Sequence, residues 1–169
     1  MNKYMGLALL SLQIFTPTTL RAQSEKDYNG TYLCISDAAG GVKFDKTSKK
    51  WVAAKFKTGE RYILTTKAGG FQKNYSSELV QTYFVTWEPH GANYEPYMKA
   101  CWTTSNQLRK VNPALNFALD GFIECKQMSI DLKINVETLR FLSSYTYGFV
   151  DGSDVDTPVI EIGNCTKIN

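Results

Sequence analysis

The sequence contains a single histidine among 169 residues, and this scarcity limits the chemistry that the chain can perform. A zinc site built from several histidines is excluded. A Ser-His-Asp triad would have to use His90, and the G-x-S-x-G sequence of a nucleophile elbow is absent. The four cysteines also lack the C-x₂-C spacing of a structural zinc site. We therefore predict no bound metal, no cofactor and no catalytic residue.

The sequence also lacks a large excess of charge of one sign. It has 19 basic and 16 acidic residues, for a formal net charge of +3. A chain this close to neutral gives no global electrostatic reason to bind nucleic acid or an anionic membrane. The glycine pairs Gly40-Gly41 and Gly69-Gly70 lack the spacing of a phosphate-binding loop. We expect no nucleic-acid partner.

Long apolar runs are scarce as well, and the longest occupies residues 4–15. It follows the positively charged Lys3 and precedes a polar segment that ends in Ala22, which is the order typical of a secretory signal peptide. The run is shorter than the ~20 residues that a membrane-spanning helix needs. We expect a signal peptide at 1–22 and a single mature domain at 23–169 with a net charge of +1, because Lys3 and Arg21 are removed. No second long run follows, so we predict no integral membrane segment in the mature chain.

All four cysteines lie in this expected mature domain. An even number of cysteines in an exported chain predicts two disulfides and an oxidising location, which is the periplasm or the extracellular medium. The sequence leaves three pairings open. We favour Cys34–Cys165, which would join the first strand to the last in a closed sheet, with Cys101–Cys125, which would link two consecutive strand-like segments.

Most of the mature domain alternates between apolar and polar residues with the period of two that strands require. Segments of this kind are residues 28–37, 61–66, 79–87, 130–134 and 159–162. Residues 42–44 and 51–56 flank a polar turn and predict a hairpin. We interpret the glycine-containing segments 38–41 and 68–70 as strand breaks. No helical period is sustained, and Pro113 divides the best helix candidate, residues 105–119.

About eight short strands with closely spaced turns predict an all-β fold. The expected architecture is an antiparallel barrel or sandwich that is lipocalin-like at the level of architecture only. Closure would also remove the exposed edges of strands that are rich in aromatic residues.

Two stretches of the sequence together carry a resemblance to known proteins. One is GGVKFDKTSKKWVAAKF at residues 40–56, and the other combines RFL, YGFVDGSD, TP and CTKI between residues 140 and 168. They resemble an uncharacterised family of small exported proteins of Gram-negative bacteria. The resemblance implies export and a common fold. It implies no activity, so it assigns no catalytic residue.

The most distinctive candidate for a binding site is the loop at residues 87–97. Two prolines restrict its backbone, and its aromatic side chains are of the types that often anchor interfaces. We expect this loop to contribute to recognition, although Trp87 is also in phase with the buried face of the preceding strand. The candidate residues are Trp87, Glu88, His90, Tyr94 and Tyr97.

These observations favour a secreted, non-enzymatic domain that binds a small apolar ligand or a protein partner. One alternative is an inhibitor of a secreted or host hydrolase, which would present the same loop. A second alternative is a hydrolase that uses the carboxylates of Glu88 and Glu95 with His90. A hollow interior would favour the small ligand, a filled barrel with a protruding loop the inhibitor, and carboxylates gathered in a cleft the enzyme.

Two other segments have both a functional and an ordinary interpretation. The oxygen-rich loop at residues 151–156 would suit calcium, but its spacing does not fit an EF-hand and Asp-Gly is a common turn. A basic group surrounds the predicted hairpin and would suit an acidic partner, although lysines on an edge strand also protect it from unwanted pairing. The group consists of Lys43, Lys46, Lys49, Lys50, Lys55, Lys57 and Arg61.

Overall fold

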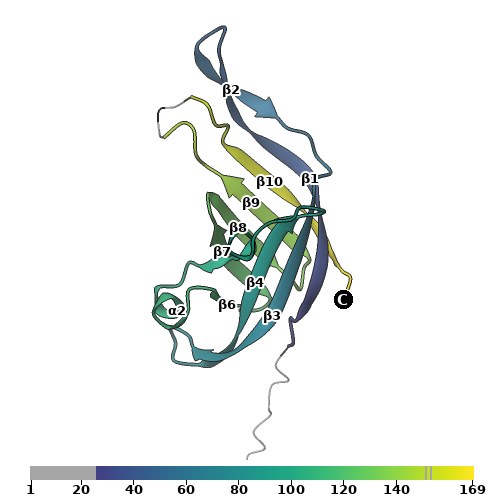
Figure 1. Ribbon diagram of the computed structural model, residues 1–169, viewed down its shortest axis with the longest axis vertical. Coiled ribbons are helices and arrows are strands. Elements are labelled where there is room, and N and C mark those ends of the chain that lie inside the picture. The colour runs from purple at the N-terminus through teal and green to yellow at the C-terminus, as the bar shows by residue number, and fades with distance from the viewer. Residues whose placement is uncertain (1–25, 151, 153) are drawn as a thin grey trace, which may run out of the picture.

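Antiparallel strands form one nearly closed, barrel-shaped sheet in the computed structural model, which describes residues 26–150, 152 and 154–169 (Figure 1). The expected signal peptide lies outside the described residues, as do Asp151 and Ser153 of the acidic loop. The strands are β1 (Gly30–Asp45), β2 (Lys50–Lys55), β3 (Arg61–Lys73), β4 (Leu79–Pro89), β5 (Trp102–Thr103), β6 (Leu115–Phe117), β7 (Phe122–Gln127), β8 (Ile130–Asn135), β9 (Arg140–Tyr145) and β10 (Val159–Lys167). Two short helices, α1 (Pro96–Lys99) and α2 (Asn106–Val111), follow β4 and β5. The predicted all-β class and its barrel form are confirmed.

The order of strands around the sheet is β5-β7-β8-β9-β10-β1-β3-β4-β6. β2 pairs with β1 beyond the part of β1 that pairs with β3, so the β1–β2 hairpin extends past the body of the barrel (Figure 1). The predicted hairpin is therefore confirmed.

A short segment of chain brings the two ends of the sheet together. Ala100 forms a bridge to Thr86 of β4, and the amide of Cys101 donates to the carbonyl of Val85 at 2.9 Å. Two residues later, Trp102 pairs with Lys126 of β7. We call residues 100–103 the seam, because they contact β4 on one side and β7 on the other.

The glycine-containing segments do not break the strands as predicted from the sequence. β1 continues through Gly40 and Gly41, with an irregularity in register between Ser36 and Ala38, and β3 continues to Lys73 with one near Gly70. The prediction was wrong because this part of β1 pairs with β10 on one edge and β2 on the other, and two ladders of hydrogen bonds outweigh the weak strand preference of glycine.

Of the helix candidate at residues 105–119, only the first part is helical. The side chain of Ser105 accepts a hydrogen bond from the amide of Leu108 and caps α2, which ends before Pro113. The chain then returns to the sheet as β6. Within the described residues, no helix has the length and apolar character needed to cross a membrane.

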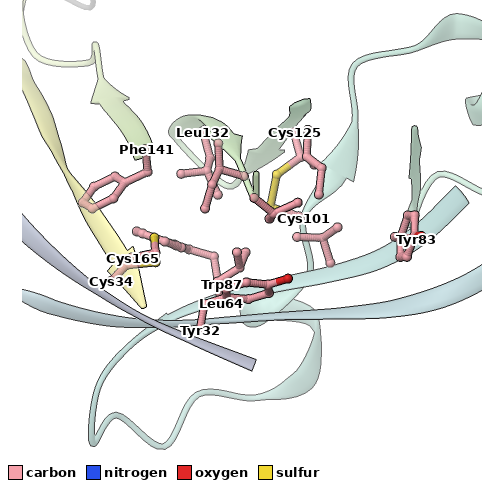
Figure 2. Packing of buried hydrophobic residues seen from close by; sticks show 14 of the residues in the cluster. Tyr32, Cys34, Leu64, Tyr83, Trp87, Cys101, Cys125, Leu132, Phe141 and Cys165 are labelled. Carbon is pink, nitrogen blue, oxygen red and sulfur yellow. A yellow bond between two sulfur atoms is a disulfide. The ribbon is translucent and has the colours of Figure 1, made fainter. Parts of the chain in front are cut away.

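Alternate residues of the strands point into the barrel and fill it (Figure 2). On β7 the alternation is complete, with Ile123, Cys125 and Gln127 buried and their neighbours exposed. Aromatic rings from three strands meet at the centre, where Trp87 stacks on Tyr62 at 4.6 Å between centroids and lies 5.1 Å from Phe141. The interior is thus packed with side chains.

Two disulfides close the fold, Cys34–Cys165 between β1 and β10 and Cys101–Cys125 between the seam and β7. Both pairings favoured from the sequence are confirmed, and no cysteine is free. Cys34 and Cys165 are direct partners in the register of the sheet. The two disulfides indicate an oxidising, non-cytoplasmic compartment.

Candidate functional site

The predicted loop lies at one end of the barrel, which we call the mouth. Here β4 ends at Pro89, β7 ends at Gln127, and β10 begins at Val159. The loop then leads into α1 at Pro96. β9 also ends at the mouth, at Tyr145.

The structure divides the five candidate residues between the interior and the surface. Trp87 is 1% exposed and belongs to the packed core, so its ring is not available at the surface. Glu88 is partly buried, and its carboxylate pairs with the ammonium of Lys99 at 2.9 Å. That ion pair connects the end of β4 to α1 across the loop.

His90, Tyr94 and Tyr97 are exposed instead. The backbone amide of His90 donates to the carbonyl of Arg61 at 2.8 Å, which fixes the start of the loop against β3. Tyr94 and Tyr97 are 37% and 65% exposed. The loop thus presents two tyrosines at the mouth.

The carboxylates proposed for hydrolysis lie in different surroundings. Glu88 is paired with Lys99, and Glu95 is exposed at the N-cap of α1. Elsewhere on the barrel, Glu124 and Glu137 form separate ion pairs with Lys133 and Lys26.

A buried polar cluster below the mouth was missed in the sequence. Glu161 is only 8% exposed, and its Oε2 accepts hydrogen bonds from the hydroxyl of Tyr62 at 2.8 Å and from that of Ser143 at 3.3 Å. Burial, and then the hydrogen bond to Glu161, raise the pKa of the Tyr62 phenol well above its ordinary value. A signal was present, because Glu161, Gly163 and Cys165 alternate along β10 and so share its inward face.

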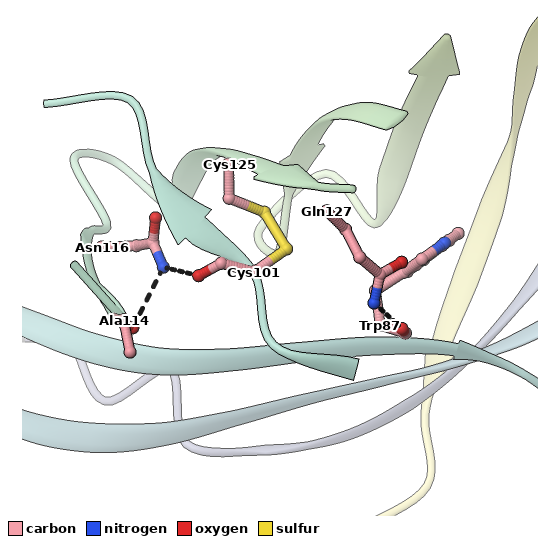
Figure 3. The surroundings of a disulfide bond; sticks show 6 residues. All are labelled: Trp87, Cys101, Ala114, Asn116, Cys125 and Gln127. Carbon is pink, nitrogen blue, oxygen red and sulfur yellow. Dashed lines mark hydrogen bonds between the residues drawn. A yellow bond between two sulfur atoms is a disulfide. The ribbon is translucent and has the colours of Figure 1, made fainter. Parts of the chain in front are cut away.

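Amide side chains complete the polar contacts inside the barrel (Figure 3). The Nε2 of Gln127 donates to the carbonyl of Trp87 at 2.6 Å, and the Nδ2 of Asn116 donates to the carbonyl of Cys101 at 2.9 Å. The first bond joins β7 to β4, and the second joins β6 to the seam, so they lie on either side of the disulfide between Cys101 and Cys125. These groups hold the backbone of β4 and the seam in place, and the cluster around Glu161 positions the Tyr62 ring on Trp87.

The opposite end of the barrel has an open pocket of about 660 Å³. Tyr28 and Tyr83 lie in its wall, and the hydroxyl of Tyr28 donates to the carboxylate of Glu137. Lys26 pairs with the same carboxylate at 2.9 Å. In the described part of the chain, no three His, Cys, Asp or Glu residues gather as they would around a metal ion.

Comparison of the chain with protein-family models, with curated proteins and with solved structures found no significant match. The resemblance to small exported Gram-negative proteins therefore stays a prediction. Function has to be argued from the geometry of the barrel and its mouth.

Proposed function

We propose that this chain is an exported, non-enzymatic interaction domain that binds a partner protein at the mouth of the barrel. The periplasm or the extracellular medium is the proposed location, in keeping with the two disulfides and the resemblance. The observation that carries the proposal is the packed interior below an exposed aromatic loop. Trp87, Tyr62 and Phe141 occupy the centre, where a small apolar ligand would otherwise bind.

The loop has the physical properties of a recognition element. Pro89 and Pro96 restrict its backbone, and the ion pair between Glu88 and Lys99 braces it, which lowers the entropy lost on binding. Tyrosine is among the side chains that most often carry binding energy at interfaces. The exposed rings are those of Tyr94 and Tyr97, so these residues are the proposed anchors.

The test combines capture of the partner with a double substitution. A photoreactive amino acid placed at His90 is used to cross-link the partner from an envelope extract. Tyr94→Ala with Tyr97→Ala should then weaken the purified complex at least tenfold, or by about 1.4 kcal/mol, with little change in melting temperature because both side chains are exposed.

The matched control is Tyr75→Ala, which removes an exposed tyrosine from the β3–β4 turn at the opposite end of the barrel. This variant should bind as the native protein does. Unchanged affinity of the double variant would remove the loop from the proposal. Hydrolysis of cell-wall polysaccharide that is lost in Glu88→Gln or Glu95→Gln would overturn the non-enzymatic function itself.

The braced loop also favours a second candidate, inhibition of a secreted or host hydrolase. A rigid loop that protrudes from a filled scaffold is suited to entering an active-site cleft. Titration against a panel of secreted proteases and glycosidases should then show stoichiometric inhibition that the tyrosine double variant loses. If every hydrolase in the panel keeps full activity, the inhibitor candidate is wrong and the proposed interaction with a partner protein remains.

A further inference from the structure

A groove of about 680 Å³ crosses the outer surface of the sheet where the β1–β2 hairpin leaves the barrel. We call it the β1 groove. Its walls come from the end of β2 and the segment after it on one side, and from β10 on the other. It is lined by Asp37, Ala38, Ala39, Gly40, Gly41, Lys55, Phe56, Thr58, Ile160 and Ile162.

The groove exists because small residues of β1 lie between larger neighbours. Gly40 pairs with Lys55 of β2 and with Ile160 of β10, so the three residues form one row across the outer face. Ala38 pairs with Ile162 in the next row. The two isoleucines are 54% and 47% exposed, and together they form the apolar wall of the groove on the β10 side.

Gly40 has no steric reason to be glycine. A Cβ built on Gly40 would have the carbonyl oxygen of Ala54 as its nearest neighbour, at 3.8 Å, and its backbone is not in the left-handed region. Its neighbour Gly41 differs, because a Cβ there would lie 2.0 Å from the carbonyl oxygen of Pro158. The close approach of the Pro158 backbone therefore requires glycine at position 41. No such requirement exists at position 40, where the missing side chain keeps the groove open.

The charged residues of the groove are Lys55 and Asp37, and Lys57 lies between the lining residues Phe56 and Thr58. The carboxylate of Asp37 accepts a hydrogen bond from the side-chain amide of Asn164, whereas in the described residues neither lysine forms an ion pair. The two ammonium groups are therefore available to an acidic ligand. Protection of the β2 edge explains the lysines alone, but it does not explain an apolar groove beside them.

We propose that the β1 groove receives an acidic segment of a partner protein that carries a large aliphatic or aromatic side chain. The apolar side chain enters the groove over Gly40 between Phe56 and Ile160, and the flanking carboxylates meet Lys55 and Lys57. This inference rests on the proposed interaction function and adds a second contact surface away from the tyrosines.

The test selects ligands without assuming their sequence. Random peptides displayed on phage are selected on the native protein and counter-selected on Gly40→Ile, which fills the groove with a residue that strands accommodate well. The enriched peptides should combine acids with one large apolar residue. Binding of a selected synthetic peptide should fall at least tenfold in Gly40→Ile, and again in Lys55→Glu with Lys57→Glu, and should weaken as salt is added.

The control variant is Thr65→Ile, which adds a comparable side chain to β3 away from the groove lining. It should bind the peptide as the native protein does, and both isoleucine variants should keep the native melting temperature to within a few degrees. Selected peptides that are basic, or that bind Gly40→Ile equally well, would overturn the inference. So would a groove occupied by phospholipid from anionic vesicles, or by a second copy in sedimentation, when no acidic peptide is enriched.

The outcome for the groove is separable from the outcome for the mouth. Peptide binding that survives Tyr94→Ala with Tyr97→Ala and is lost in Gly40→Ile supports the groove even if the loop fails its own test. Cross-linked partner binding that depends on the tyrosines supports the mouth, and peptide binding that is equal in Gly40→Ile and the native protein overturns the groove, whatever the result at the mouth.

Discussion

Gly163 of β10 shows how a single absent side chain determines the packing of the barrel. A Cβ built on Gly163 would lie 2.1 Å from the carbonyl oxygen of Ile35 and 2.6 Å from Cε1 of Phe141. The ring of Phe141 therefore covers the glycine, and it also packs against Trp87 and Tyr62 in the core. The aromatic centre of the barrel depends on this space.

We predict that Gly163→Ala destabilises the protein by about 2 kcal/mol, because overpacking forces backbone or ring displacement. Urea denaturation followed by tryptophan fluorescence measures the change. Gly40→Ala is the matched control within the same pair of strands, and it should be neutral or stabilising by about 0.5 kcal/mol, since its Cβ meets no close atom. Equal effects of the two substitutions would contradict this account.

At the scale of elements, closure of the sheet depends on the seam, which contacts β4 on one side and β7 on the other. The segment at residues 100–103 forms only short pairings with its neighbours, one bridge to β4 and two residue pairs with β7, and the disulfide between Cys101 and Cys125 holds it to β7. The amide of Thr103 also donates to the carbonyl of Pro113 at 2.8 Å, which ties the chain after α2 to the seam. Opening should therefore begin here.

We predict that Cys101→Ala with Cys125→Ala lowers the free energy of unfolding by about 3 kcal/mol and speeds amide hydrogen exchange first at the seam. The comparison is Cys34→Ala with Cys165→Ala, which opens a much longer loop and should cost about 5 kcal/mol. β1 and β10 remain paired over many residues in that variant. Amide hydrogen exchange should therefore speed up across the whole sheet and not first in one segment. Exchange that rises equally at the seam and in β1 after loss of Cys101–Cys125 would count against the seam as the weak element.

For the molecule as a whole, buried and partly buried tyrosines determine how stability responds to high pH. The pKa values of Tyr28, Tyr32 and Tyr62 are all raised above the ordinary value of 10.0, with burial as the largest cause in each case. Below that value both the folded and the unfolded chain keep these protons, so the stability is fully present. Above it the unfolded chain loses protons that the folded chain retains, and rising pH favours unfolding.

We predict that the free energy of unfolding falls steadily above about pH 10 and that Tyr62→Phe makes this decline less steep. At neutral pH the same substitution should cost about 1 to 3 kcal/mol, since Glu161 loses its closest hydrogen-bond donor inside the barrel. Denaturation series at several alkaline pH values measure both effects. Tyr97→Phe, which alters an exposed tyrosine, is the control and should leave the slope unchanged. A decline of equal slope in Tyr62→Phe would contradict the assignment.

The sequence by itself determined the class of fold and the hairpin at the start of the domain, and it favoured the observed disulfides among three possible pairings. Alternation with a period of two is a local property, and it places Cys34 and Cys165 on inward faces without knowledge of the partners. The pairing followed from one further assumption, that a sheet of many short strands closes on itself. The loop with Tyr94 and Tyr97 was likewise visible as a restricted aromatic segment between strands.

The pairing of the strands and its register were visible only in the tertiary structure, and the proposed binding surfaces depend on both. Local composition marked residues 38–41 as a break, but pairing with β2 and β10 keeps them extended and turns their small side chains into a groove. Trp87 became core because Tyr62 and Phe141, distant in sequence, pack on its ring. Glu161 became buried because the register brings Tyr62 and Ser143 to its carboxylate. Contacts between residues far apart along the chain have no local pattern, so their consequences appear only when the sheet has closed.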